Sequence, residues 1–261
     1  MIEYPEIVYK YRSWKGFHKD ILLKNEIYFA SPNELNDPFD FRIPRNWSLL
    51  TDEQMVEFAE SRINSFTNIP FGQIEDYKKF ILNKLKNDKE LQSESDTFTY
   101  EKQNLDFGVL SLSKTYKGVS MWSHYADSHK GFCVGFKTKE LVGSGELGYG
   151  HVEYLNDFPQ INPLESSATN TANIQIYSKS KEWEYEKEFR ILKIKIDGFK
   201  NKANRIHAFK DQAIAEIILG MEIIEDDKKT IIEMAKSKNI KVYQIHQIPF
   251  TFEIEKKEIK Y

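Results

Sequence analysis

Residues 181–192 constrain the fold of this chain more than any other segment. Glutamate occupies every second position from Glu182 to Glu188, and an apolar, strand-like run follows from Phe189 onward. If the segment is extended, alternate side chains point to the same side, so these carboxylates share one face. Like charges on one strand face repel each other, and Arg190 on that face is the expected counter-charge. Two interpretations stay open: a solvated strand edge held by basic neighbours, or carboxylates used for acid–base or sugar-hydroxyl chemistry.

Length and composition favour a single well-packed domain. The chain has 261 residues, of which 40% are hydrophobic and 14% aromatic, which is enough for one substantial core. Its net charge of −3 gives no general case for binding nucleic acid or membranes. The single cysteine, Cys133, excludes an intramolecular disulfide and a cysteine-rich zinc site. No apolar run of about 18 residues and no signal peptide is present, so we expect a cytoplasmic protein without a membrane partner.

Stretches rich in β-forming residues alternate with helical patterns. Strands are predicted at residues 7–12, 27–30, 107–113, 131–136, 189–196, 214–219, 241–248 and 250–254. Short helices are predicted at residues 16–25 and 120–126, and a longer one at residues 226–237. The polar residues 156–171 and the glycine-rich residues 143–150 are expected to be loops.

Between residues 51 and 104 the pattern is helical. Thr51 and Gln54 have the spacing of a capping box at its start, and a second helix is expected around residues 80–85. This block interrupts the strand patterns without a linker on either side. We therefore predict one α+β domain over residues 1–261 with a helical insertion at about 51–104.

An arginine and two serines are candidate ligand-binding residues on the predicted strands. Arg12 ends the first strand beside Tyr11, where it can hold a phosphate through two parallel hydrogen bonds while a ring stacks on the ligand. Ser111 and Ser113 share one face of a later strand, where hydroxyl groups can orient a ribose or an amide. For each residue alone, an ordinary surface ion pair or a half-buried polar face remains the alternative.

Residues 121–131 gather an indole, two imidazoles and a phenol. Trp122 and Tyr125 lie on one helical face, a spacing typical of core packing. His124 and Asp127 can form a base and the group that orients it. The two histidines do not have the spacing of a metal site, and the chain contains no P-loop, dinucleotide loop or serine-hydrolase elbow. A metal site is therefore not expected.

Four segments together resemble the bacterial domain-of-unknown-function family 2971. They read Tyr9-Lys-Tyr-Arg12, Phe29-Ala-Ser-Pro through Leu35-Asn-Asp-Pro-Phe39, Leu110-Ser-Leu-Ser113 with Met121-Trp-Ser-His-Tyr-Ala-Asp and His129-Lys-Gly131, and Lys181-x-Trp183 with Tyr185-Glu-x-Glu-x-Arg190. The resemblance extends from about residue 7 to residue 220. It implies no activity by itself.

A second resemblance does imply one. Arg12, a later serine strand with Ser111 and Ser113, and the Glu186-Lys-Glu188 sequence are similar to the arginine–serine–glutamate layout of ADP-ribosyltransferases. The middle motif departs from the family pattern, because it reads Ser-Leu-Ser instead of Ser-Thr-Ser. The helical insertion fits the helical region that often separates the first strand from the serine strand. This resemblance implies an ADP-ribosyltransferase-like mixed β core.

The same resemblance implies roles for individual residues, with NAD⁺ as the donor substrate and no metal. Glu188 would stabilise positive charge on the ribose, and Glu186 would orient or deprotonate the acceptor. We expect their proximity to raise the pKa of one of them. Arg12 would hold the diphosphate. The other expected ligand-binding residues are Tyr11, Ser111, Ser113, Trp122, His124 and Tyr125.

The expected function is that of a bacterial toxin or phage-defence effector that modifies a protein or a nucleic acid. A cognate antitoxin or inhibitor protein is then a candidate partner, and water as acceptor would give NAD⁺ hydrolysis. Two other classes stay open. The first is a non-catalytic nucleotide-binding or partner-binding module of a defence system. The second is a metal-dependent nuclease that uses Glu184, Glu186 and Asp37.

Overall fold

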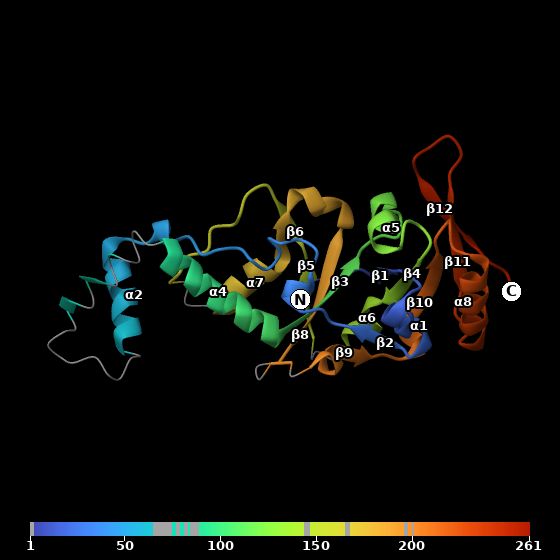
Figure 1. Cartoon of the computed structure of the whole chain (residues 1–261). Helices are drawn as coiled ribbons and strands as arrows, with labels where there is room; N and C mark the ends of the chain where they lie inside the picture. Colours follow the sequence, from blue (N-terminus) through green and yellow to red (C-terminus); the bar gives the residue numbers. More distant parts are fainter. Residues whose placement is uncertain are drawn as a thin grey trace.

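A large sheet forms the centre of the protein. The computed structural model describes residues 3–64, 75–76, 79–80, 83, 89–143, 147–164, 168–195, 198–199 and 201–261. The strands of the central sheet are β1 (Ile7–Arg12), β3 (Phe107–Ser113), β4 (Phe132–Lys137), β5 (Gly148–His151), β8 (Glu188–Ile194), β10 (Ile214–Leu219), β11 (Val242–Gln247) and β12 (Ile254–Glu258). Their order is β12-β11-β10-β4-β1-β3-β8-β5, and only β10 and β11 run parallel (Figure 1). The α+β class is confirmed.

The central sheet opens between β1 and β3. These strands are paired at Tyr9 and Ser113 alone, whereas β1 pairs with β4 along its whole length and β3 pairs with β8 along its whole length. No ladder pair joins residues 10–12 of β1 to residues 110–112 of β3, and the same edge of β3 pairs instead with Ala30 at Val109. Two small sheets flank the large one, namely β2 (Glu26–Tyr28) with β9 (Ile206–Ala208) and β6 (Glu153–Leu155) with β7 (Ser178–Ser180).

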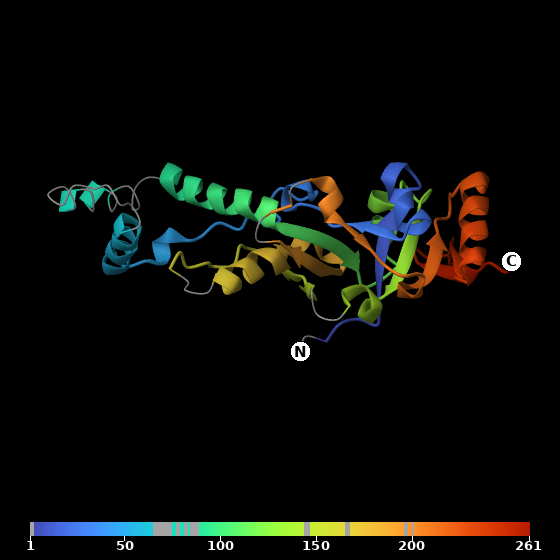
Figure 2. The ribbon, with the colours of Figure 1, turned by 90° about the horizontal axis from the view of Figure 1, so that it is seen from below.

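Helices lie at the ends and on the faces of the sheet. The α-helices are α1 (Asp20–Leu23), α2 (Asp52–Asn64), α4 (Lys89–Asp106), α5 (Val119–Tyr125), α6 (Thr138–Val142), α7 (Ala168–Tyr177) and α8 (Glu225–Ser237). Short 3₁₀ helices include η1 (Gly16–Lys19), η2 (Pro32–Glu34), η5 (Lys181–Glu186) and η6 (Lys202–Arg205). Figures 1 and 2 show α2 and the outer part of α4 at one end of the molecule and α8 at the other. No helix among the described residues is long and apolar enough to cross a membrane.

Helices α2 and α4 lie within the block expected to be helical, at residues 51–104 and just beyond. Thr51 and Gln54 form the expected capping box, each backbone N–H donating to the other's side chain. Most of the helix expected around residues 80–85 lies outside the described residues. Two loop predictions need correction, because α7 begins inside the expected loop 156–171 and β5 begins inside the glycine-rich stretch. The strand expected at 250–254 is also wrong, since β12 begins only at Ile254.

The alternating glutamates are not a strand. Residues Lys181–Glu186 form the 3₁₀ helix η5, and β8 starts at Glu188. The Ser180 side chain accepts a hydrogen bond from the Glu182 backbone and caps the helix, which provides a local alternative to sheet pairing. Lys187 then takes a left-handed conformation with φ of 46° and turns the chain into β8. An alternating pattern alone does not exclude such a turn, because charged residues form no core to hold a strand register.

Candidate functional site

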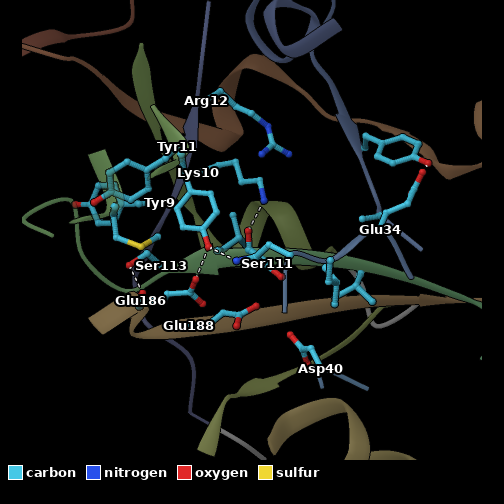
Figure 3. A pocket seen from close by; sticks show the side chains of 18 of the residues that line it. Tyr9, Lys10, Tyr11, Arg12, Glu34, Asp40, Ser111, Ser113, Glu186 and Glu188 are labelled. Atoms are coloured by element: carbon cyan, nitrogen blue, oxygen red, sulfur yellow. Dashed lines mark hydrogen bonds between the residues drawn. The ribbon is translucent and has the colours of Figure 1, made fainter. Parts of the chain in front are cut away.

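A cavity of about 330 Å³ opens where β1 and β3 separate. We call it the site cavity. Residues 9–12 of β1 and residues 109 and 111–113 of β3 line it (Figure 3). The remaining walls come from η1, from β2 and the segment after it through η2 to residue 40, from α5, from β7 and from the junction of η5 with β8. The volume lies at the lower end of the range typical of small-molecule pockets.

Most of the predicted ligand-binding residues meet in this cavity. Its lining contains Tyr11, Arg12, Ser111, Ser113, Tyr125, Glu186 and Glu188. They come from segments up to about 180 residues apart, and they enter one space because β1 and β3 are the strands that separate.

Trp122 and His124 do not belong to the cavity. Trp122 is 0% exposed, its indole N–H donates to the backbone oxygen of Tyr116, and it packs in the core, so it cannot stack on a ligand. His124 is exposed and shares a hydrogen bond with Tyr185 instead of with Asp127. The predicted base-and-orienter pair of His124 and Asp127 is therefore wrong. Helical spacing identified a shared face here, but only the packing decides which side of α5 meets the core.

Tyr11 reaches the cavity without a free ring face. It is 2% exposed, its ring packs edge-on against Trp122 at 5.1 Å, and its hydroxyl donates to the backbone oxygen of Thr115 at 2.8 Å. The expected stacking role of Tyr11 is not supported, because its ring is committed to the core.

Two cations from β1 form one wall of the cavity. In Figure 3, Arg12 and Lys10 lie on the side opposite Glu188. Burial lowers the pKa of Arg12 to about 10, so the guanidinium stays charged at neutral pH. It makes no ion pair and no side-chain hydrogen bond with other described residues. A half-buried arginine without a counter-charge is a ready binding group for an anion.

Lys10 is fixed beside Arg12. Its ammonium group donates to the backbone oxygen of Ser111 at 2.5 Å, which bridges the gap between β1 and β3. Burial lowers the pKa of Lys10 well below its ordinary value, and the charge of Arg12 lowers it further. An anion placed between Arg12 and Lys10 would therefore stabilise the charged forms of both side chains.

A buried ion network forms the opposite wall. Arg190 is 0% exposed and donates to both oxygens of Glu188, at 2.9 and 3.0 Å, and to both oxygens of Asp40, at 2.9 and 2.6 Å. The expected pairing of Arg190 with the acidic residues is thus confirmed for Glu188. Asp40 completes the set from the turn that follows η2.

Lys179 is the second cation of this network. Its ammonium nitrogen lies 2.5 Å from Glu186, 3.4 Å from Glu188 and 3.8 Å from Asp40. Burial works to lower the pKa of Lys179, but the three carboxylates outweigh it and raise that pKa. The lysine therefore stays charged and couples the two glutamates that the sequence analysis singled out.

The charge state of Glu188 differs from the expectation. Burial works to raise its pKa, but Arg190, Lys179 and a hydrogen bond from Ser111 together lower it to about 2. The expected rise through like-charge proximity does not occur at Glu188, because the positive charges of Arg190 and Lys179 lower its pKa. Glu188 is a permanently ionised carboxylate at neutral pH.

Glu186 is held by groups from three elements. Besides Lys179, the Tyr125 hydroxyl donates to its carboxylate at 2.5 Å, and Asn36 donates to that hydroxyl at 2.8 Å. Burial, and next the hydrogen bond to Glu186, raise the pKa of Tyr125, so the phenol remains a donor. The Ser113 hydroxyl also donates to the backbone oxygen of Glu186, at 2.7 Å.

The four glutamates are therefore unequal. Glu182 and Glu184 are exposed on η5, and Glu184 pairs with Lys181 at 2.9 Å. Glu186 and Glu188 are buried and face the site cavity. The shared strand face predicted for all four is wrong, because η5 turns the first two toward solvent.

Three residues of the site were not singled out from the sequence. Lys10 lies between Tyr9 and Tyr11 in the first strand, and its position two residues before Arg12 was an available signal. Asp40 follows the Asn-Asp-Pro-Phe sequence at residues 36–39, whose residue types are typical of a turn, and Lys179 follows no recognisable pattern. The proposed nuclease set does not assemble: Asp37 does not line the site cavity and Glu184 is exposed. Among the described residues, no group of three or more histidine, cysteine or acidic side chains is arranged to hold a metal ion.

One family model matches the segment that contains most of the carboxylate wall. The family model described as Protein of unknown function (DUF2971) matches residues 121–191. The resemblance to DUF2971 is thereby confirmed over these residues. The match is shorter than the expected span of about residues 7–220, and it contains the carboxylate wall with Glu186, Glu188 and Arg190 but not the cationic wall with Arg12. No curated protein and no solved structure matches the chain significantly.

Proposed function

We propose that this DUF2971-matching protein has an ADP-ribosyltransferase-like core and transfers ADP-ribose from NAD⁺ to a macromolecular acceptor, a protein or a nucleic acid. One observation carries the proposal. A single cavity contains Arg12, which has no ion-pair partner among the described residues, and on the opposite wall the ionised carboxylate of Glu188 beside Ser111. A dinucleotide with an anionic diphosphate and a cationic nicotinamide ribose has matching charges.

Donor binding follows from the two walls. Arg12 holds the diphosphate through parallel hydrogen bonds, and the buried amino group of Lys10 lies beside it, where a bound anion favours its protonated form. The nicotinamide ribose then lies toward Glu188, whose carboxylate accepts a hydrogen bond from the ribose 2′-hydroxyl. Because Glu188 is buried and stays ionised, it stabilises the positive charge that develops on the ribose as nicotinamide leaves.

The transfer step balances without a metal or a redox partner. The bond between ribose C1′ and the nicotinamide nitrogen breaks, and its electron pair leaves with neutral nicotinamide. A lone pair of the acceptor forms the new bond to C1′. The acceptor's proton passes to the Glu186 carboxylate and then to water. Lys179 and Tyr125 hold that carboxylate in place, and water as acceptor would give free ADP-ribose.

A second candidate function is a non-catalytic nucleotide-binding module. The observation that favours it is the bidentate pairing of Glu188 with Arg190, since both carboxylate oxygens already have a strong donor. Such a buried pair also has a purely structural use. This class binds NAD⁺ or another nucleotide at Arg12 and leaves it intact.

The replacement Glu188→Gln separates the two functions. We expect the wild-type protein to release nicotinamide from NAD⁺ in cell lysate. The Glu188→Gln variant should release it at least about 100-fold more slowly, because a neutral amide cannot stabilise the ribose cation. Glu184→Gln is the matched control, since it removes an exposed glutamate from the same segment and is expected to keep the wild-type rate. Circular dichroism checks that each variant is folded.

The wild-type result decides against one of the two classes. NAD⁺ binding without nicotinamide release would overturn the transferase proposal and support the binding module. Equal activity of wild type and Glu188→Gln would overturn the assignment of Glu188.

We further propose that the activity serves a toxin or an antiviral defence system in the cytoplasm, held in check by an antitoxin or inhibitor protein. Uncontrolled transfer to cellular macromolecules is harmful, so expression of the wild type should arrest growth and Glu188→Gln should not. Growth arrest by both proteins would contradict this role.

A further inference from the structure

A second cavity of about 360 Å³ adjoins the site cavity at Arg12. Arg12, Phe17, Tyr28 and Glu34 line both cavities. The second cavity is completed by η1, α1, β2 and the segment from η6 to the start of β9. A ligand bound by Arg12 therefore has space on both sides, one toward Glu188 and one toward these elements.

The second cavity is lined by aliphatic and aromatic side chains. Ile21 and Ile27 form its buried part, while Phe17 lies at the mouth with 63% of its surface exposed. The Phe17 ring contacts the edges of His18, at 4.6 Å between centroids, and of Tyr28, at 6.1 Å. Burial, aided by Arg12 and Lys10, lowers the pKa of His18 to about 4, so this ring is uncharged at neutral pH. Such a surface suits a flat, uncharged heteroaromatic ring.

Carboxylates gather around this apolar space. Glu26, Glu34 and Asp20 line the second cavity, and Lys202 is the lysine among its lining residues. Glu34 pairs with Lys202 at 3.5 Å and accepts from Tyr28 at 2.9 Å. Asp20 pairs with Lys24 at 3.1 Å, whereas Glu26 has no ion pair with a described residue. Arg12 and Lys202 are the basic residues of this lining, and Lys202 already pairs with Glu34. An additional phosphate beyond the reach of Arg12 would therefore lie next to the negative charge of Glu26.

We propose that the second cavity binds the adenosine half of the donor, and that Glu26 and Glu34 reject a 2′-phosphate there, so that NAD⁺ is used and NADP⁺ is not. The identity of the donor rests on the proposed function. The division of the ligand into two halves rests on the shared wall at Arg12. The diphosphate bridges the two cavities at Arg12, with the nicotinamide ribose in the site cavity and the adenine against Phe17.

Binding of the two halves tests the division directly. Calorimetry with AMP, with nicotinamide mononucleotide and with adenosine 2′,5′-bisphosphate measures each part without turnover. Ala203→Trp fills the second cavity from an exposed position of η6, and Ser237→Trp on the exposed surface of α8 is the matched control. We expect Ala203→Trp to weaken AMP binding at least about tenfold and nicotinamide mononucleotide binding less than about twofold. Equal weakening of both ligands, or of neither, would overturn the division.

A separate variant tests the rejection of a 2′-phosphate in the second cavity. We expect the wild type to bind adenosine 2′,5′-bisphosphate at least about tenfold more weakly than AMP, and Glu26→Gln to narrow that ratio. If the bisphosphate binds the wild type as tightly as AMP, the selectivity inference fails.

Failure of this inference and failure of the proposed function are distinguishable. If the wild type releases no nicotinamide but binds AMP, and Ala203→Trp abolishes that binding, the adenosine assignment of the second cavity holds and the transferase proposal is refuted. If the wild type releases nicotinamide and Ala203→Trp leaves the KM for NAD⁺ unchanged, the transferase proposal holds and the adenosine assignment is refuted.

Discussion

Replacing Arg190 by methionine tests whether the ion network holds the site together. The guanidinium is 0% exposed and makes four charge-assisted hydrogen bonds of 2.6–3.0 Å, two to Glu188 and two to Asp40. Methionine fills much of the space but leaves both carboxylates buried. Lys179 remains, at 3.4 Å from Glu188 and 3.8 Å from Asp40, and compensates in part. Removing one partner of a buried pair costs about 3–5 kcal/mol, so we expect the free energy of unfolding to fall by about 4 kcal/mol.

Urea-induced unfolding followed by circular dichroism measures this loss. With an m-value of about 3 kcal/mol/M, a loss of about 4 kcal/mol lowers the urea midpoint by about 1.3 M. Lys181→Met is the control, because it removes a cation from the exposed pair with Glu184 in the preceding turn. An exposed pair contributes less than about 1 kcal/mol, so this midpoint should stay near the wild-type value.

A second replacement checks the cause. In the Arg190→Met background, Asp40→Asn removes one of the two stranded charges, so it should recover part of the lost stability while destabilising the wild type. The reasoning is refuted if Arg190→Met is no less stable than Lys181→Met. It is also refuted if Asp40→Asn destabilises both backgrounds equally.

Two further predictions concern acid and a close backbone contact. The pKa of Glu188 is lowered from 4.5 to about 2 in the folded protein, so its ionised form stabilises the fold above pH 4.5, and this contribution of about 3 kcal/mol is lost as the pH falls from 4.5 to 2. Urea midpoints at pH 5 and pH 3 should therefore differ more for the wild type than for Glu188→Gln, and an equal difference would contradict the assignment. Gly131→Ala should lower the melting temperature by several degrees, since its Cβ would lie 2.2 Å from the backbone oxygen of Arg12, whereas Gly148→Ala meets nothing closer than 3.6 Å. Equal melting temperatures for the two glycine variants would show that the chain relaxes around Gly131 at no cost.

Local patterns predicted the elements that carry the site. The β-forming runs at residues 7–12 and 107–113 became β1 and β3, which supply Arg12, Ser111 and Ser113 to the site cavity. These predictions succeeded because both runs are rich in aliphatic and aromatic residues that suit a largely buried strand. The gap between β1 and β3 was not predictable, since no local pattern records how far two strands stay paired.

The errors arose where a local pattern has more than one packing solution. Trp122 and Tyr125 share a helical face, but Trp122 enters the core while the hydroxyl of Tyr125 reaches Glu186. His124 follows Trp122 in sequence and is exposed on another side of α5. Helical spacing predicts which residues are neighbours, and the surrounding strands decide what those neighbours face.

The acidic segment shows the same division between sequence and tertiary structure. By itself the sequence determined that Glu186, Glu188 and Arg190 lie close together, because residues two or four apart cannot separate far. Only the tertiary structure decided that η5 turns Glu182 and Glu184 outward and that Asp40 and Lys179 complete the ion network. The physical reason is that buried charges are stable only beside counter-charges, and in this fold several of those come from segments far away in the chain.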